Sequence, residues 1–411
     1  MKKNFLFICF VLLSCFSLAA QNPSESFTKL FARFKEMAVV YEECRARNDY
    51  EGMSRALKEQ IALLEKVEPA GEGANDREMR EKLLANQYYN LACAYALKSK
   101  SKAAVEAFRK AVEHGFKNYR HTCNDPDLAS IREDRRFRKL LGRIIQYDNL
   151  HMLRTARSYR REQTDSLPNF TYQSASDHNL KAVRERFRLD SIAGSGDEVS
   201  KIMNVMTFVH NNIRHDGSNY ALCEFNANDI YNYHKATGMG VNCRHLAMML
   251  NEMYLSLGIP SRYVTCMPKD PNDGDCHVIV AVYSAQLGKW LWIDPSFNAY
   301  VKDENGHLLS IAEVRERLID GRPVVLNEDA NWNNKVKQTK EEYLENYMAK
   351  NLYYFICAEQ SRFNAESRYR YTGIRYVALL PEGFETQSVS GDMYTVTSDA
   401  EYFWQPPSSA K

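Results

Sequence analysis

The chain has 411 residues, of which 45% are hydrophobic and 26% are charged. This length predicts two or three domains, and the hydrophobic content excludes wholesale disorder. Lysine and arginine number 54 against 52 acidic residues, so the net charge provides no general attraction to nucleic acid or to an anionic membrane. Ten cysteines in a chain of this length are too few for a disulfide-built scaffold.

Residues 1–20 have the layout of a secretory signal peptide. Two lysines precede an apolar run from Phe5 to Leu13, small residues follow, and cleavage is predicted after Ala20. The run is shorter than the roughly 20 residues that span a bilayer, and no later stretch reaches that length. Lipoprotein processing with a lipid anchor at Cys15 is the alternative, because the residues before it loosely resemble a lipobox. We expect an exported bacterial protein, periplasmic or extracellular, without a membrane span.

Residues 21–163 are predicted to form a helical domain. Apolar residues recur at helical spacing from Phe27 to Leu64, and a second helical pair extends from about Arg80 to Glu113. This second pair resembles one tetratricopeptide repeat. A repeat-like region predicts either a groove for a protein partner or a domain that only packs beside the main one. The residues that carry the resemblance are Tyr88, Leu91, Ala92, Tyr95, Ala104, Phe108 and Ala111.

The segment 131–162 is rich in lysine and arginine but also carries an apolar stripe at helical spacing. This combination predicts one helix with a solvated basic face, rather than a site for an anionic partner. Polar residues around Pro168 predict a linker, assigned to 164–192, before a core at 193–300.

A cysteine at a predicted helix start is the first candidate for chemistry. Gly238 to Val241 predicts a tight turn, and Arg244 to Gly258 has an apolar helical face, so Cys243 is expected at a helix N-terminus. The unpaired N–H groups and the positive end of the helix dipole stabilise a thiolate there. The backbone N–H of Cys243 is the natural oxyanion donor, and the sequence assigns no second donor.

A thiolate nucleophile also needs a proton acceptor and a group that orients the acceptor. His277 is predicted to open a strand, and Asp294 is predicted to end the next strand. Neighbouring antiparallel strands can place these two residues side by side, and a helix packed on the sheet can bring Cys243 to the other imidazole nitrogen. The three residues together predict a catalytic triad.

Four spaced motifs resemble those of the transglutaminase-like superfamily. The resemblance covers about residues 199–300. It implies an α+β, papain-like core in which a helix packs on an antiparallel sheet, here preceded by an all-α repeat-like domain. It also implies a Cys-His-Asp triad, which falls on Cys243, His277 and Asp294. The motifs are Gly-x-x-x-Asn-Cys-Arg-His-x-Ala from Gly238, Leu-Gly-Ile-Pro-Ser-Arg from Leu257, His-Val-x-Val-x-Val from His277, and Trp-x-x-x-Asp-Pro-Ser from Trp290.

Such a triad forms a thioester from an amide or ester carbonyl. Water as the acceptor gives a cysteine peptidase or amidase, which is the expected activity on a peptide or protein substrate, without a cofactor or metal. The alternatives are a protein-crosslinking transglutaminase, in which an amine is the acceptor, and a non-catalytic peptide- or protein-binding module that uses the helical repeat region. No acidic calcium loop of the EF-hand type is present, so calcium-dependent crosslinking has no support.

The cysteines near the triad have two further interpretations. Cys243, His245, Cys276 and His277 could ligate zinc, but neither Cys-x-His nor adjacent Cys-His is a common zinc-site spacing. His245 is expected to pack or face solvent. Cys276 could form a disulfide with Cys266 or with Cys223, and the sequence leaves the pairing open.

Residues 301–411 are predicted to form a C-terminal α/β extension that completes the core. Asn305–Gly306 predicts a hairpin turn, and Ser310–Glu313 predicts a capping box that opens a helix to about Ile319. A second helix is predicted from about Lys340 to Gln360. Two strands are predicted after it, at 369–380 and 393–397.

Overall fold

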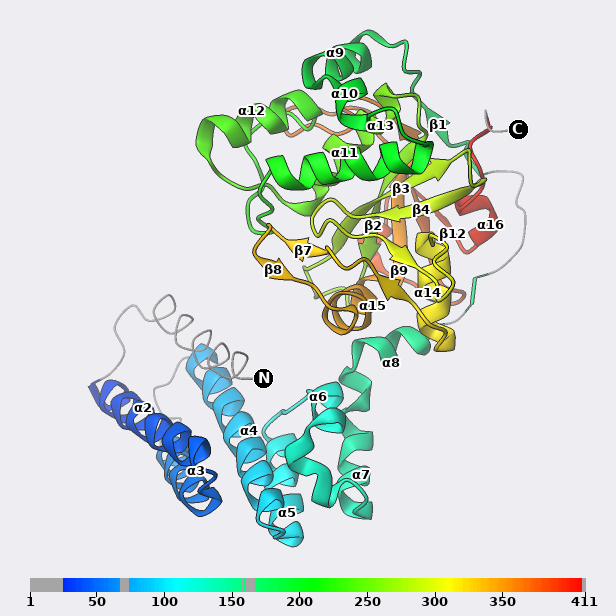
Figure 1. Ribbon diagram of the computed structural model, residues 1–411. Coiled ribbons are helices and arrows are strands. Elements are labelled where there is room, and N and C mark those ends of the chain that lie inside the picture. The colour runs from blue at the N-terminus through cyan, green and yellow to red at the C-terminus, as the bar shows by residue number, and fades with distance from the viewer. Residues whose placement is uncertain (1–24, 67–73, 157, 160–166, 409–411) are drawn as a thin grey trace. The chain divides into compact units, whose positions relative to one another are not determined.

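The computed structural model describes residues 25–66, 74–156, 158–159 and 167–408. The chain divides into two compact units, the first ending at Asp148 and the second beginning at Asn149 (Figure 1). The predicted signal peptide at 1–20 and the alternative lipid anchor at Cys15 lie outside the described residues. Within the described ranges, no helix combines the length and the apolar composition that crossing a membrane requires.

The first unit is helical, which confirms the prediction. Its long helices form two successive hairpins, the first made by α2 (Glu25–Ala46) and α3 (Tyr50–Glu65) and the second by α4 (Ala74–Leu97) and α5 (Ser101–Glu113). Shorter elements complete the unit: α6 (Tyr119–Asn124), η1 (Pro126–Ile131), α7 (Arg135–Ile144) and η2 (Ile145–Tyr147).

The residues that resemble a tetratricopeptide repeat line the contact between α4 and α5. Ala92, Ala104, Phe108 and Ala111 have no exposed surface. The alanines let the two helices approach closely, and the phenylalanine fills the space beside them. The helical hairpin is therefore as expected, while the assignment to that repeat family stays a prediction.

The units divide where the sequence predicts one continuous basic helix. In place of a single helix over 131–162, α7 ends in the 3-10 turn η2, and α8 (Asn149–Arg154) follows. The apolar residues of α7 are buried in the core of the first unit, whereas Leu150 and Leu153 of α8 are buried in the core of the second. Because the two apolar stripes serve different cores, the helix is interrupted between them.

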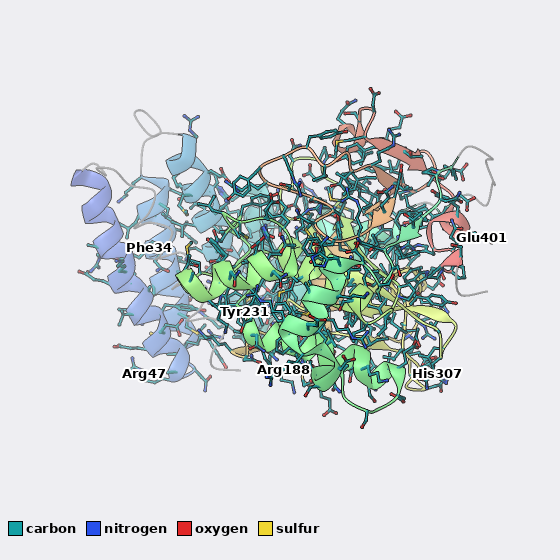
Figure 2. The ribbon with its side chains drawn as sticks, turned by 90° about the horizontal axis from the view of Figure 1, so that it is seen from above. Phe34, Arg47, Arg188, Tyr231, His307 and Glu401 are labelled. Atoms are coloured by element: carbon teal, nitrogen blue, oxygen red, sulfur yellow. The ribbon has the colours of Figure 1, made fainter. Side chains whose placement is uncertain are left out.

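The predicted linker at 164–192 also differs from the structure. Its described part contains β1 (Thr171–Tyr172), α9 (His178–Phe187) and the start of α10 (Leu189–Ala193). Arg188, labelled in Figure 2, joins the two helices in a left-handed conformation with φ of 50°. The apolar face of α9 packs on α13, described below, so the second unit begins well before residue 193.

A six-stranded sheet forms the centre of the second unit, in the spatial order β12-β11-β9-β2-β3-β4. All neighbouring strands are antiparallel except β11 and β12, which are parallel. Half of the sheet comes from residues 261–293 and half from residues 354–397, so the two segments form one sheet. The strands are β2 (Ser261–Met267), β3 (His277–Ser284), β4 (Lys289–Ile293), β9 (Tyr354–Ala358), β11 (Tyr376–Leu379) and β12 (Tyr394–Thr397).

Both faces of this sheet are buried. Along β3, Val278, Val280 and Val282 belong to one hydrophobic cluster, and Ile279, Ala281 and Tyr283 belong to another. This division follows from the alternation of side chains along a strand. The sequence therefore reads as a continuous apolar run at β3, and the sheet needs a layer of helices on each side.

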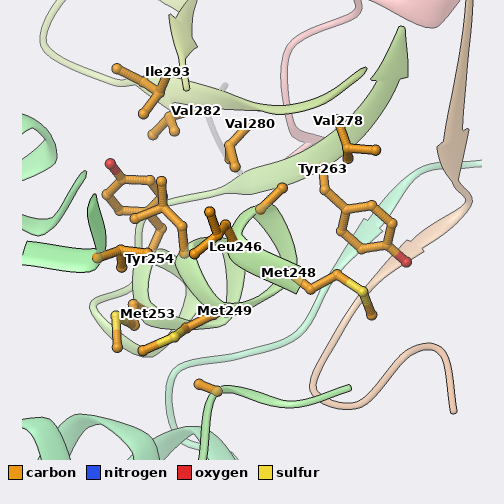
Figure 3. Packing of buried hydrophobic residues seen from close by; sticks show 14 of the residues in the cluster. Leu246, Met248, Met249, Met253, Tyr254, Tyr263, Val278, Val280, Val282 and Ile293 are labelled. Carbon is orange, nitrogen blue, oxygen red and sulfur yellow. The ribbon is translucent and has the colours of Figure 1, made fainter. Parts of the chain in front are cut away.

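Helix α13 (Cys243–Ser256) is the central helix on the first face (Figure 1). Figure 3 shows Leu246, Met249 and Met253 of α13 against Val280 and Val282 of the sheet. The helices α9, α11 (Glu198–Asn212) and α12 (Ala227–Thr237) pack around α13. The opposite face is covered by α8, α14 (Ile311–Asp320), the π-helix η3 (Lys340–Met348), α15 (Ala349–Asn351) and α16 (Ala400–Phe403).

The helix predicted from Lys340 to Gln360 is wrong in its second half. The helical residues end at Asn351, and Tyr354–Ala358 form the central strand β9. Every residue of β9 is buried, so the strand lacks the polar alternation that distinguishes a strand from a helix. The capping box at Ser310 and Glu313 is confirmed. Within the described part of the chain, three short strand pairs lie outside the sheet: β1 with β10 (Gln360–Ser361), β5 (Val301–Lys302) with β6 (Val325–Leu326), and β7 (Asn331–Trp332) with β8 (Val336–Lys337).

A buried arginine ties the C-terminal end of the chain to the sheet. Arg262 on β2 is 2% exposed, and its Nη2 donates to the carbonyl oxygen of Phe403 at 2.7 Å. The guanidinium carbon lies 4.5 Å from the ring centroid of Phe170 and 4.6 Å from that of Trp290. Aromatic faces and a carbonyl oxygen thus stabilise a cation that burial would otherwise penalise.

Arg262→Ala is expected to lower the free energy of unfolding of the second unit by about 3–5 kcal/mol, because it removes these contacts and leaves a cavity. All four tryptophans lie in this unit, so urea unfolding followed by tryptophan fluorescence reports on it alone. Arg375→Ala removes a half-exposed pair with Glu359 and is the control, with an expected loss below about 1 kcal/mol. Equal losses in the two variants would contradict this role of Arg262.

Candidate active site

The N-terminus of α13 carries Cys243, as the sequence predicts. Asn242 caps the helix: its Oδ1 accepts from the backbone N–H of His245 at 3.2 Å, and its carbonyl oxygen accepts from that of Leu246 at 3.3 Å. The N–H of Cys243 is not used by this cap. The thiol is half-buried, and the buried apolar face of α13 fixes it relative to β2 and β3.

The register of β3 and β4 brings His277 and Asp294 together. These strands are antiparallel with Val280 opposite Ile293, so the start of β3 meets the residue that follows β4. Nε2 of His277 lies 2.7 Å from Oδ2 of Asp294, and neither side chain has exposed surface. The hydrogen bond orients the imidazole and leaves Nδ1 for the cysteine.

The electrostatics of the site favour a thiolate–imidazolium pair. Burial alone would raise the pKa of the Cys243 thiol, but hydrogen bonds from His215 and His277 and the charge of His277 lower it to about 6. Burial lowers the pKa of His277, but the charge of Asp294 and its hydrogen bond outweigh burial and raise this pKa to about 10. Both groups are therefore charged between about pH 6 and pH 10.

Asp294 is held ionised by a full set of partners. Oδ2 accepts the hydroxyl of Tyr343 at 2.6 Å, and Oδ1 accepts the backbone N–H of Ser296 at 2.8 Å. Burial raises the pKa of Asp294, but the charge of His277 and these hydrogen bonds keep it below its usual value. A buried charge is tolerated only when its polar atoms are paired in this way.

Four side chains beside the triad are missed by sequence reasoning: Tyr343, Tyr347, His215 and Trp332. The two tyrosines come from the π-helix η3, and the hydroxyl of Tyr347 lies 3.3 Å from Nδ1 of His277. Their spacing of four residues puts both on one helical face, which is the signal that could have found them. Single-turn π segments are frequent at functional sites.

The alternative zinc ligands do not converge on one point. Nδ1 of His245 is 2.6 Å from Oδ1 of Asn242, and its ring packs against Phe225 with a centroid distance of 4.8 Å. Burial and then the charge of Arg244 lower the pKa of His245 to about 4. His245 is thus a packing residue, and among the described residues it does not join Cys243, Cys276 and His277 in a metal-ligating group.

One cluster of potential metal ligands lies in the first unit. Cys93, Asp125 and Asp127 present ligand atoms within 4.8 Å of one another. Asp125 is already used, because Oδ2 accepts the hydroxyl of Tyr89 at 2.6 Å and Oδ1 accepts the backbone N–H of Asp127 at 2.9 Å. Burial raises the pKa of Cys93 well above its ordinary value, which disfavours the thiolate that ligates metals. We assign these contacts to packing and capping.

The cysteines of the described residues are all free thiols, so neither disulfide that the sequence left open is formed. Cys266 is fully buried in the cluster between the sheet and α14. Cys276 is half-buried, and burial followed by the negative charge of Cys243 raises its pKa. Of the thiols at the site, Cys243 is the one poised to ionise.

Comparisons with known proteins place the site within a recognised domain. Residues 186–295 match the family model of the transglutaminase-like superfamily, and this range includes Cys243, His277 and Asp294. No curated protein matches the chain. Among solved structures, the chain is similar to a "putative cysteine protease" from Cytophaga hutchinsonii, with 18% sequence identity and a TM-score of 0.23. The likeness covers 41% of this chain and 55% of that one, and at this TM-score it carries no argument about fold or activity.

Alkylation of Cys243 by iodoacetamide is expected to rise with pH around a midpoint near 6, because the thiolate forms above that pKa. His277→Ala removes a hydrogen bond and a positive charge and should move the midpoint up, toward about 8.5. Mass spectrometry of the Cys243 peptide separates this thiol from the others, and Cys276→Ser is the control that leaves the midpoint in place. An alkylation midpoint near pH 8.5 for Cys243 in the wild-type protein would contradict the pairing of its thiolate with His277.

Tyr343→Phe is expected to slow acylation of Cys243 about 10- to 100-fold, since a hydrogen bond to a charged group contributes about 1.5–3 kcal/mol. Rapid mixing with an activated ester measures this rate. The matched control is Tyr254→Phe, which removes an equally buried hydroxyl that donates to the carbonyl oxygen of Ile202 at 2.7 Å, away from the triad. If both variants slow acylation to the same degree, the bond from Tyr343 to Asp294 has no specific role.

Proposed function

We propose that the second unit, whose residues 186–295 form a domain of the transglutaminase-like superfamily, is a cysteine peptidase or amidase. Cys243 is the nucleophile, His277 is the base and Asp294 is the orienting residue. The observation that carries the proposal is the buried 2.7 Å bond between His277 and Asp294, in a site where the same imidazole lowers the pKa of the Cys243 thiol. This arrangement supports acyl transfer through a thioester.

In the first half of the reaction, the thiolate of Cys243 attacks the carbonyl carbon of an amide. A sulfur–carbon bond forms, and the carbonyl π electrons move to the oxygen. The backbone N–H of Cys243, at the positive end of α13, donates to this oxyanion. The intermediate then collapses, the carbon–nitrogen bond breaks, and the leaving amine takes the proton of His277.

In the second half, His277 is neutral and accepts a proton from a water molecule. The hydroxide that results attacks the thioester carbon, and collapse of the second intermediate breaks the carbon–sulfur bond. The carboxylic acid product leaves, and the thiolate and imidazolium are restored. Asp294 holds the ring throughout and stabilises the imidazolium whenever it forms, while Asp294 itself stays ionised.

A peptide or protein is the proposed substrate. Two exposed aromatic side chains are linked to the site through contacts with neighbouring residues. Tyr220 is 48% exposed and its ring contacts His245, two residues from the nucleophile. Trp332 is 36% exposed and donates a hydrogen bond to His215. His215 in turn lowers the pKa of the Cys243 thiol. Exposed aromatic rings beside a nucleophile support the binding of an extended chain with apolar side chains.

Two further proposals concern the whole chain. Export to the periplasm or the cell exterior is supported by the signal-like composition of residues 1–20. Binding of a protein partner by the first unit is supported by its successive helical hairpins, which are the units from which repeat proteins build binding grooves.

The test incubates the full chain with a peptide library and dansylcadaverine, a labelled primary amine. We expect cleaved peptides to outnumber peptides that carry the label, because water needs no acceptor site of its own. Cys243→Ala should lower the cleavage rate by at least about 10⁴-fold. Cys276→Ala is the matched control, because Cys276 lies beside the same site and its thiol is not activated.

Each other outcome contradicts the proposal in a different way. Label incorporation that exceeds cleavage indicates a crosslinking enzyme. Cleavage that persists in Cys243→Ala excludes this cysteine as the nucleophile. Peptide binding without either product, measured by fluorescence polarisation, indicates a non-catalytic binding module.

A further inference from the structure

His215 lies beside the nucleophile because two backbone segments run unusually close together. Val241 and His215 form a parallel bridge, in which the N–H of Val241 donates to Arg214 at 2.9 Å and that of Asp216 donates to Val241 at 2.7 Å. A Cβ atom at Gly240 would lie 2.8 Å from the carbonyl oxygen of Arg214, so only glycine permits this approach. The bridge holds His215 next to the loop that ends at Cys243.

The β7–β8 hairpin of the C-terminal extension fixes the orientation of His215. Asn333 and Asn334 form its tight turn, with φ of 54° and 56°. The side chain of Asn333 holds the backbone of His215 at both polar atoms: Oδ1 accepts from the N–H at 2.7 Å, and Nδ2 donates to the carbonyl oxygen at 3.0 Å.

The same hairpin determines which nitrogen of His215 carries the proton. Nε1 of Trp332 donates to Nδ1 of His215 at 2.9 Å. An indole N–H is only a donor, so Nδ1 must be the acceptor, and in the neutral ring the proton lies on Nε2. This second nitrogen is buried and has no hydrogen-bond partner among the described residues.

The group that Nε2–H can reach is the sulfur of Cys243, because interaction with the His215 side chain is the largest effect that lowers the pKa of this thiol. His277 contacts the same sulfur, and its Nε2 is already bound to Asp294. The two histidines therefore differ in function. His277 can exchange a proton with the substrate, whereas the bond from Trp332 to Nδ1 directs the N–H of His215 to Nε2.

We propose that His215 is a catalytic residue that donates the second hydrogen bond to the oxyanion, and that Trp332 is the positioning residue that keeps its proton on Nε2. This inference rests on the proposed function. When the sulfur–carbon bond forms, negative charge leaves the sulfur and appears on the oxygen attached to the adjacent carbon. The Nε2–H of His215 and the backbone N–H of Cys243 then share that oxygen, and neither gives up its proton.

Two probes of the same thiolate separate this role from a structural one. Acylation by 4-nitrophenyl acetate passes through an oxyanion, whereas alkylation by iodoacetamide displaces iodide and forms none. In His215→Ala, the acylation rate is expected to fall by about 10²–10³-fold relative to the alkylation rate. His215→Gln keeps a side-chain N–H donor and should recover at least tenfold of this loss. The exposed His178 provides the control variant His178→Ala, which should change neither rate.

Trp332→Phe tests the fixed tautomer. It leaves the imidazole in place but removes the donor to Nδ1, so the ratio of acylation to alkylation should fall severalfold at neutral pH.

Two results would overturn the inference while leaving the proposed function intact: equal loss of both rates in His215→Ala, or full acylation in that variant. A wild-type protein that is alkylated but never acylated at Cys243 contradicts the proposed function itself, and this inference with it.

Discussion

The buried bond between His277 and Asp294 is the constraint on which the second unit depends. Two charged side chains without exposed surface are stable only if every polar atom finds a partner. Those partners come from three parts of the chain: Cys243 on α13, the backbone after β4, and Tyr343 on η3. The predicted core and the C-terminal extension therefore form one folding unit, because neither alone satisfies the pair.

The two-sided sheet explains how these parts meet. Helix α13 packs on one face and presents Cys243 at its first residue, while η3 packs on the other face and reaches Asp294 with a hydroxyl. Strand β3 lies between them and supplies His277 as its first residue. The site thus forms where β3 begins and β4 ends, between the two helical layers that cover the faces of the sheet. On the face that η3 covers, Arg262 donates a hydrogen bond to Phe403 and lies against its ring, which attaches the C-terminal helix α16 to the sheet.

The sequence predicts those features that depend on short, local signals. Cys243 follows a glycine turn and opens an apolar helix, His277 opens a strand and Asp294 ends one, so antiparallel pairing suffices to propose the triad. His215, Trp332 and Tyr343 are not found in this way, because their roles depend on a hairpin turn with left-handed asparagines and on a π-helix, both far along the chain. The division at Asp148 is hidden for a related reason: two apolar stripes that face different cores look like one helix. Strand β9 is missed because it is buried on both faces, so its sequence does not alternate between polar and apolar residues.

The most direct test of the account is the protonation state of His277 in the resting protein. Nitrogen-15 NMR of the histidine-labelled full chain, with His277 assigned by its absence in His277→Gln, reports both ring nitrogens. Nδ1 and Nε2 are both expected to be protonated at neutral pH, since the pKa of His277 is raised to about 10 by Asp294 and the thiolate of Cys243. Asp294→Ala is expected to return the ring to a neutral form at that pH. A wild-type ring that is neutral near pH 7 would contradict the thiolate–imidazolium pair and the mechanism derived from it.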